Sequence, residues 1–156
     1  RLVDLNVTAL TRLSRAAMKV FMERDQGTIV NIASVMALEA LPITSVYSAS
    51  KAYVSLFSRG LQQEIVGTNV TVQVVLPAAV ATEIYDGTIM PLDQLPPEIV
   101  MTPDDMVDAA LAGLDTGEIV TLPSVNDATL WQNYEAARQA LFVASQTGKP
   151  AQRYIP

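Results

Sequence analysis

The hydrophobic positions change their period along the chain, and each change marks a predicted element. Over residues 1–23, apolar residues recur at spacings of mostly three and four, which predicts an amphipathic helix. The polar break at 25–27 ends this helix. The β-branched run at 28–32 then predicts a buried strand of a parallel sheet.

The same alternation repeats in the middle of the chain. A helix is expected over 45–66, because apolar residues there form one broad face and Thr44 or Ser45 could cap its start. A strand is expected over 70–76, and Pro77 ends it because proline cannot extend a central strand. Alternating helices and strands indicate an α/β fold with a parallel sheet.

The last third predicts one more strand between two helices. Thr102 and Pro103 have the chemistry of a helix start, and this helix should continue to about residue 115. A short strand follows at 119–122, and a final helix begins at 126–127. Trp131 in that helix is expected in the core, whereas residues 147–156 are expected to form a loosely ordered tail.

Candidate chemistry is concentrated between the first predicted strand and the helix after it. Ser34 follows the strand, and Tyr47 and Lys51 lie four residues apart, on one face of the helix. A lysine cation within about 4–6 Å favours a phenolate, and so lets a tyrosine exchange a proton with a carbonyl or alcohol oxygen. The order of elements places all three residues at the carboxyl edge of the sheet, where ligands bind in open α/β folds.

A simpler interpretation exists for each of these residues. The spacing of Tyr47 and Lys51 is common by chance, and describes equally an exposed tyrosine beside a solvated lysine. Ser34 could only cap a turn after its strand. Four motifs taken together favour the chemical interpretation. They are Asn6-Val7-Thr8-Ala9, Asn31-Ile32-Ala33-Ser34, Tyr47-Ser48-Ala49-Ser50-Lys51 and the segment from Pro77 to Thr82.

In order and spacing, these motifs closely resemble those of the short-chain dehydrogenase/reductase family. The resemblance extends from Val3 to about Leu122, with one departure, because Ala78 stands where the family has glycine. It implies that Tyr47 is the acid/base, that Lys51 lowers its pKa and that Ser34 holds the substrate oxygen. Asn6 would perturb its helix and complete a proton relay through a water molecule, while Asn31 supports the site structurally.

The resemblance also implies a nicotinamide cofactor, NAD or NADP, without choosing between them. Tyr47 and Lys51 would contact it, together with the segment after the second strand, where Pro77, Val80 and Thr82 are the candidates. Ala78 is compatible with this if its φ is negative, and strained if φ is positive.

A full member of the family begins with a strand and a glycine-rich phosphate-binding turn, and the seven glycines of this chain do not form such a turn. We therefore expect residues 1–156 to be the C-terminal part of one Rossmann-like, doubly wound α/β domain with about three parallel strands. The first strand would then have an unpaired edge.

The segment 83–101 is rich in proline and large apolar residues, Ile84, Tyr85, Ile89 and Met90 among them. It could be an irregular surface loop, but the family's substrate loop falls here. It is therefore expected to be a lid that excludes water over an apolar carbonyl or alcohol substrate.

Composition excludes several classes of function. The absence of histidine removes the Ser-His-Asp triad and the usual zinc sites, and the absence of cysteine removes disulfides. The net charge of −6 disfavours a nucleic-acid surface. No apolar run is long enough to span a bilayer and no signal peptide is visible, so a cytoplasmic enzyme without a membrane partner is expected.

Two functions therefore remain. The first is an NAD(P)-dependent oxidoreductase that interconverts a carbonyl and a secondary alcohol. The resemblance to the family implies that it forms a homodimer or tetramer through the first two helices. The alternative is a fragment that cannot bind cofactor, or a non-enzymatic dimerising module.

Overall fold

The computed structural model describes residues 1–86 and 91–155. The chain divides into two compact units, Arg1–Ser124 and Val125–Pro156, and each is considered by itself. All the candidate site residues lie in the first unit.

A parallel sheet of three strands forms the centre of the first unit, within the part of the chain that the structure describes. The strands are β1 (Gly27–Ile32), β2 (Val70–Val75) and β5 (Val120–Thr121), in the order β1-β2-β5. The register pairs Gly27 with Val70 and Ile32 with Val75, so β1 and β2 end at the same edge. The predicted sheet is confirmed, and β1 is an edge strand of it.

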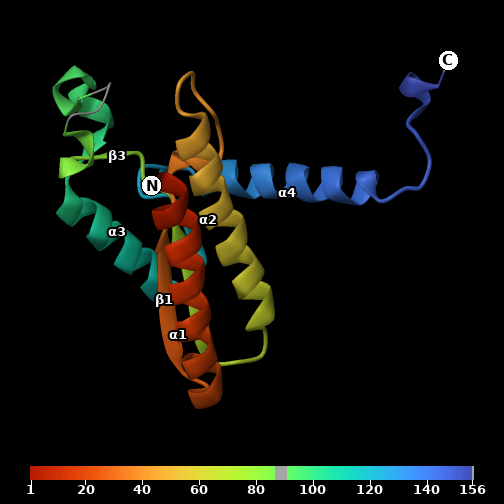
Figure 1. Cartoon of the computed structure of the whole chain (residues 1–156), viewed down its shortest axis with the longest axis horizontal. Coiled ribbons are helices and arrows are strands. Elements are labelled where there is room, and N and C mark those ends of the chain that lie inside the picture. Colours follow the sequence, from red (N-terminus) through yellow and green to blue (C-terminus); the bar gives the residue numbers. More distant parts are fainter. Residues whose placement is uncertain (87–90, 156) are drawn as a thin grey trace. The chain divides into compact units, whose positions relative to one another are not determined.

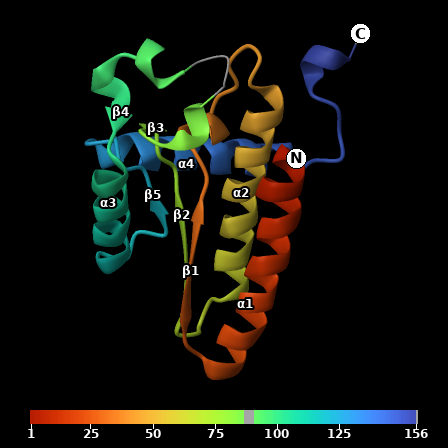
Figure 2. The same cartoon turned by 60° about the vertical axis from the view of Figure 1, so that its left-hand side comes forward.

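Helices cover both faces of this sheet. Helices α1 (Leu10–Arg24) and α2 (Ser45–Glu64) lie together on one face, and α3 (Pro103–Asp115) lies on the other (Figures 1 and 2). Helix α2 connects β1 to β2, as a parallel pair requires. This layered arrangement is that of the predicted doubly wound α/β class.

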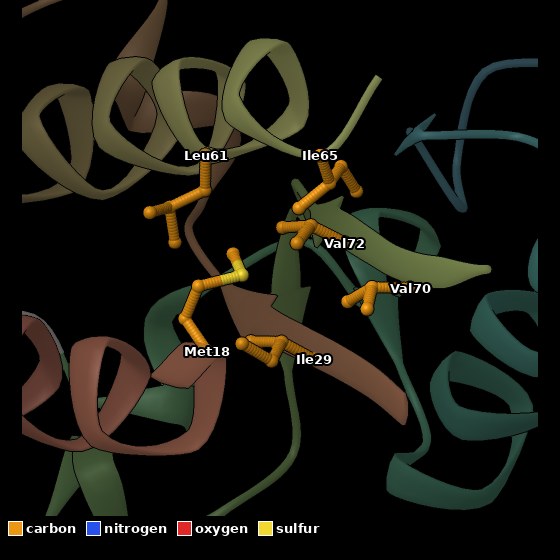
Figure 3. Close-up of a cluster of buried hydrophobic side chains, with 6 residues drawn as sticks. All are labelled: Met18, Ile29, Leu61, Ile65, Val70 and Val72. Atoms are coloured by element: carbon orange, nitrogen blue, oxygen red, sulfur yellow. The ribbon is translucent and has the colours of Figure 1, made fainter. Parts of the chain in front are cut away.

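The main core fills the space between the sheet and its helical pair (Figure 3). It is built from one methionine of α1, two residues at the end of α2 and three strand residues that point toward one another, namely Met18, Leu61, Ile65, Ile29, Val70 and Val72. A second buried cluster of Ala33, Val54, Val74 and Leu76 lies toward the carboxyl ends of the strands. It forms a close-packed base under the candidate site.

Buried and exposed side chains alternate along β1 because of this packing. Ile29 and Asn31 are buried, whereas Val30 and Ile32 are each 40% exposed. Successive side chains of a strand point to opposite faces, so one face of β1 packs on α1 and α2 while the other remains partly open.

Helix α3 begins as its sequence predicts, because the Thr102 hydroxyl accepts a hydrogen bond from the Asp105 amide and Pro103 occupies the first position. Its buried residues are Ala110 and Gly113. A β-carbon on Gly113 would lie 2.6 Å from the Thr121 hydroxyl oxygen, so only glycine fits this contact with β5.

The segment expected to be a lid is fastened at both ends. Strand β3 (Ala79–Val80) pairs in parallel with β4 (Val100–Met101) in a small separate sheet. Between them, the described residues form three short 3₁₀ turns, Glu83–Tyr85, Leu92–Gln94 and Pro97–Ile99. Ile89 and Met90 lie outside the described residues.

The second unit consists of α4 (Ala128–Ser145) and the residues after it. Asp127 caps α4 by accepting a hydrogen bond from the Thr129 amide. No residue of α4 is buried, so the expectation that Trp131 lies in a core is wrong; its ring is partly exposed and stacks on Tyr134, with 5.2 Å between centroids. Residues 147–155 are exposed and contain one 3₁₀ turn, Gln152–Tyr154.

Candidate active site

A change of helix type marks the first site segment. Residues Asp4–Ala9 form a π-helix before α1 continues in ordinary α geometry from Leu10. Asn6 lies within it, and its Nδ2 donates a hydrogen bond of 3.0 Å to the hydroxyl of Ser50 on α2. Short π segments inside helices are frequent at functional sites. The expected perturbation of the helix at Asn6 is therefore present.

Tyr47 and Lys51 occupy the first two turns of α2. The ammonium nitrogen of Lys51 lies 5.8 Å from the centre of the Tyr47 ring, and it donates a hydrogen bond of 3.0 Å to the main-chain oxygen of Ile32. Ile32 is the last residue of β1, so this bond holds the lysine at the carboxyl end of the sheet. Burial lowers the pKa of Lys51, because desolvation penalises the ammonium form.

Ser34 lies just beyond β1, and is buried. Its hydroxyl accepts a hydrogen bond from the Met36 amide at 3.2 Å and donates a long one, 3.4 Å, to the main-chain oxygen of Pro77. The simpler interpretation of a turn-capping serine is thus true of this structure. It is compatible with a chemical role, because a hydroxyl retains a second lone pair and its long donated bond is a weak one.

Pro77 connects the ends of the two long strands. Its main-chain oxygen also accepts a hydrogen bond of 3.0 Å from the Val35 amide, so the loop after β1 is fixed to the loop after β2. Ala78 is not strained: among the described residues other than glycine, only Asp25 and Ile43 have positive φ. The departure from the family's glycine at this position therefore has no cost in backbone conformation.

The remaining cofactor candidates lie on β3, in the case of Val80, and two residues after it, in the case of Thr82. Val80 pairs with Met101, and the Thr82 hydroxyl donates a long hydrogen bond of 3.4 Å to the main-chain oxygen of Val80. Thr82 is exposed, so its hydroxyl is accessible to a ligand.

Sequence reasoning missed one residue that the structure relates electrostatically to Tyr47. Tyr85 is partly buried, and burial together with the negative charge of Tyr47 raises the pKa of Tyr85. From the sequence, Tyr85 was expected only as one of the large apolar residues of the lid. Its position three residues after Thr82 is the signal that the sequence offers, and only the structure shows that it ends the 3₁₀ turn Glu83–Tyr85.

Asn31 lies in the core of the first unit and is hydrogen-bonded there. Its Nδ2 donates a hydrogen bond of 2.9 Å to the Ser58 hydroxyl, and its Oδ1 accepts a longer one, 3.4 Å, from Ser14. The three side chains are buried and belong to β1, α2 and α1. They join α1 and α2 to β1 within the core.

The arrangement presents a tyrosine, a lysine and a serine hydroxyl near the ends of parallel strands, with a fourth polar side chain, Asn6, bound to the same helix. Within residues 1–86 and 91–155, no cluster of acidic side chains could hold a metal ion. No helix in the described part of the chain is long and apolar enough to cross a bilayer.

The architecture places the chain in the Rossmann-like α/β class. A family model described as short chain dehydrogenase matches residues 1–89, more than half of the chain. The chain therefore belongs to the short-chain dehydrogenase family.

Curated relatives agree with this assignment. The chain is 34% identical over 98 residues to the very-long-chain 3-oxoacyl-CoA reductase of Anas platyrhynchos, a match that covers 63% of this chain and 31% of the relative. It is 41% identical over 81 residues to the human 17-beta-hydroxysteroid dehydrogenase type 3, a match that covers 52% of this chain and 26% of that enzyme. The matched region is thus about a third or less of either relative.

Solved structures match over almost the whole chain. The short-chain dehydrogenase of Sphingobium yanoikuyae in complex with NADPH superposes with a TM-score of 0.91 and 40% identity, which covers 98% of this chain and 59% of that one. The bulky-bulky ketone specific alcohol dehydrogenase of Comamonas testosteroni gives a TM-score of 0.85 and 38% identity, which covers 99% and 57%. The predicted fold class is confirmed.

Proposed function

We propose that this chain forms the catalytic part of an NAD(P)-dependent oxidoreductase that interconverts a carbonyl and a secondary alcohol. The observation that carries the proposal is the pairing of Tyr47 and Lys51, with the ammonium group 5.8 Å from the phenol ring and held by the last carbonyl of β1. In the direction of reduction, a bound nicotinamide cofactor supplies the hydride.

Tyr47 is the proton donor in this scheme. Its phenol gives a proton to the carbonyl oxygen as the carbonyl carbon gains the hydride, and the oxidation of an alcohol reverses both transfers. The ammonium group of Lys51 stabilises the negative charge that develops on the phenol oxygen, and it acts more strongly in a site shielded from water than in bulk solvent.

Ser34 and Asn6 assist the transfer. The Ser34 hydroxyl holds the substrate oxygen, and to do so it exchanges its weak bond to the Pro77 carbonyl for a bond to the substrate. Asn6 reaches the tyrosine helix through Ser50, and would complete a proton relay from Lys51 to solvent.

The donors of the site fit a nicotinamide cofactor. One N–H of the Lys51 ammonium group is engaged by Ile32, which leaves the others for the hydroxyl groups of a ribose. Val80 and Thr82 would bind the carboxamide group through backbone and hydroxyl, beside Pro77. The Sphingobium relative is a complex with NADPH. NAD and NADP both fit this donor set.

The proposed substrate is apolar. The segment 83–101 carries Tyr85, Leu92 and Leu95, all partly buried, so a lid of this composition would exclude water from a hydrophobic substrate. The names of the relatives point the same way, since one acts on a bulky-bulky ketone and another is a hydroxysteroid dehydrogenase. We infer a bulky carbonyl or secondary alcohol.

A homo-oligomer formed through α1 and α2 is part of the proposal. Helix α2 has exposed apolar residues, including Val46, Tyr53 and Leu56. A groove of about 460 Å³ lies between α2 and the N-terminal segment that carries Val3 and Val7. Gly60 adds no side chain to this surface, and nothing lies within 4 Å of its β-carbon position. The same surface also serves the alternative, a dimerising module without enzymatic activity.

Nicotinamide fluorescence on titration with the complete protein separates the two functions. The oxidoreductase binds reduced cofactor and turns over a bulky ketone, and Tyr47→Phe abolishes turnover while cofactor binding persists. Folded protein that binds no cofactor would favour the dimerising module, and turnover retained by Tyr47→Phe would refute the role of Tyr47.

A further inference from the structure

Ser50 joins the two segments that carry Asn6 and Tyr47. Its hydroxyl accepts a hydrogen bond from Asn6 Nδ2 at 3.0 Å, and it donates one to the main-chain oxygen of Tyr47 at 2.7 Å. The side chain is buried, with 4% of its surface exposed. One hydroxyl thus contacts a residue 44 positions away and the turn of α2 that holds the acid/base candidate.

The geometry at both ends makes this contact a determinant of position. Asn6 lies in a π-helix, a rare conformation that occurs mostly as a short segment within an α-helix. A serine that donates to a carbonyl one turn back in a helix bends that helix locally. If the hydroxyl is removed, the Asn6 amide loses this partner. The π-helical turn at Asn6 and the turn of α2 at Tyr47 are then no longer joined through this hydroxyl.

A similar arrangement, in which a serine accepts from an asparagine and donates to a helix carbonyl, occurs two turns further along α2. Ser58 accepts a hydrogen bond from Asn31 Nδ2 at 2.9 Å, and donates one to the main-chain oxygen of Val54 at 2.8 Å. Ser58 is also fully buried. The two serines therefore make the same two kinds of hydrogen bond, but to different partners.

We propose that Ser50 is a positioning residue, which fixes the Asn6 turn relative to the Tyr47 turn during proton transfer. The inference rests on the proposed function for its chemical consequence. Its structural part stands independently, because the bonds to Asn6 and Tyr47 exist without substrate.

Amide hydrogen exchange tests the structural part without any catalysis. In Ser50→Ala, the amides of the π-helix Asp4–Ala9 and those of residues 48–51 should exchange faster together, by roughly tenfold. Ser58→Ala should leave both segments near the wild-type rate at matched global stability. Equal protection of these segments in the two variants would overturn the inference, whatever the activity of the protein.

Kinetics test the chemical part in the complete protein. Ser50→Ala should lower kcat roughly tenfold with little change in the KM for cofactor, because a small displacement of a catalytic group costs rate more than binding. Ser58→Ala should retain kcat. The double variant Asn6→Ala, Ser50→Ala should have a kcat no lower than that of Asn6→Ala alone, because both substitutions break the same hydrogen bond between Asn6 and Ser50.

Multiplicative effects in the double variant, or an equal loss of kcat in Ser50→Ala and Ser58→Ala, would overturn the role of Ser50 in positioning. A different result, turnover that persists in Tyr47→Phe, would refute the proposed function and leave the exchange measurement to decide on Ser50.

Discussion

The ammonium group of Lys51 donates a hydrogen bond of 3.0 Å to the main-chain carbonyl of Ile32. The side chain on α2 that is to act on Tyr47 is thus fixed to the last residue of β1. The spacing of four along α2 brings the ammonium nitrogen to 5.8 Å from the centre of the phenol ring, and the bond to Ile32 fixes the lysine side chain in that position. Charge at this position has measurable consequences for stability.

Stability should depend on pH through Lys51. Burial lowers its pKa in the folded protein below the ordinary value of 10.5. Between the lowered pKa and 10.5 the unfolded chain binds more protons, so the folded state gains stability as pH rises through this window. The free energy of unfolding of the wild type, relative to Lys51→Met, should therefore increase with pH there. Urea titrations at several pH values measure the difference, and a flat or falling difference would contradict it.

Tyr85 should ionise later than an ordinary tyrosine. Burial raises its pKa first, and the charge of the Tyr47 phenolate raises it further. Phenolate absorbance as a function of pH should lose its late component in Tyr85→Phe. In Tyr47→Phe the Tyr85 transition should move to lower pH, because the neighbouring negative charge is gone. Tyr53→Phe is the control and should leave the late component in place.

Two glycines should respond to alanine in opposite directions. Gly113→Ala places a β-carbon 2.6 Å from the Thr121 hydroxyl oxygen, so α3 must shift from β5, and a loss of about 1–3 kcal/mol is expected. Gly60→Ala meets no atom within 4 Å and should gain about 0.5–1 kcal/mol from helix propensity. Chemical denaturation of the two variants checks both signs, and a stabilised Gly113→Ala would refute the contact.

Ile43 has a conformation that its side chain disfavours. Its φ is 64°, in the left-handed region, and its side chain is 75% exposed. Ile43→Asn should therefore stabilise the protein by about 1 kcal/mol, because asparagine tolerates this region and little burial is lost. Leu41→Asn, an exposed position without positive φ, should show no such gain in thermal unfolding.

The proposed subunit interface can be tested with a charge on α2. Leu56 is 66% exposed on the outer side of the helix, and Leu56→Glu should dissociate a homo-oligomer that forms through α1 and α2. Sedimentation velocity measures the change in mass. Leu141→Glu, at an equally exposed position on α4, should leave the assembly intact. Dissociation by Leu141→Glu alone would place the interface elsewhere.

Much of the fold was predictable because local rules and tertiary packing agree in it. The helix start at Thr102 and Pro103, and the end of β2 before Pro77, are set by residues that allow few alternatives. The prediction that Trp131 lies in a core failed for a different reason. An apolar period predicts a buried face only if another element is present to cover it, and the period alone does not show this.

The site was predictable in its parts and not in its connections. Tyr47 and Lys51 share a helix face, so their proximity follows from a spacing of four. The bond between Asn6 and Ser50 spans 44 positions, and no local pattern contains it. The relation of Tyr85 to Tyr47 likewise depends on how the segment after β3 folds back.

The sequence by itself determined which residues can exchange a proton, and on which helix and strand ends they lie, because chemistry and periodicity are local properties. The tertiary structure decided which of them are buried, which interact electrostatically, as Tyr85 does with Tyr47, and which are joined through the Ser50 hydroxyl. These properties depend on solvent exclusion and on distances across the chain, which only the packing of α1 and α2 on the sheet supplies.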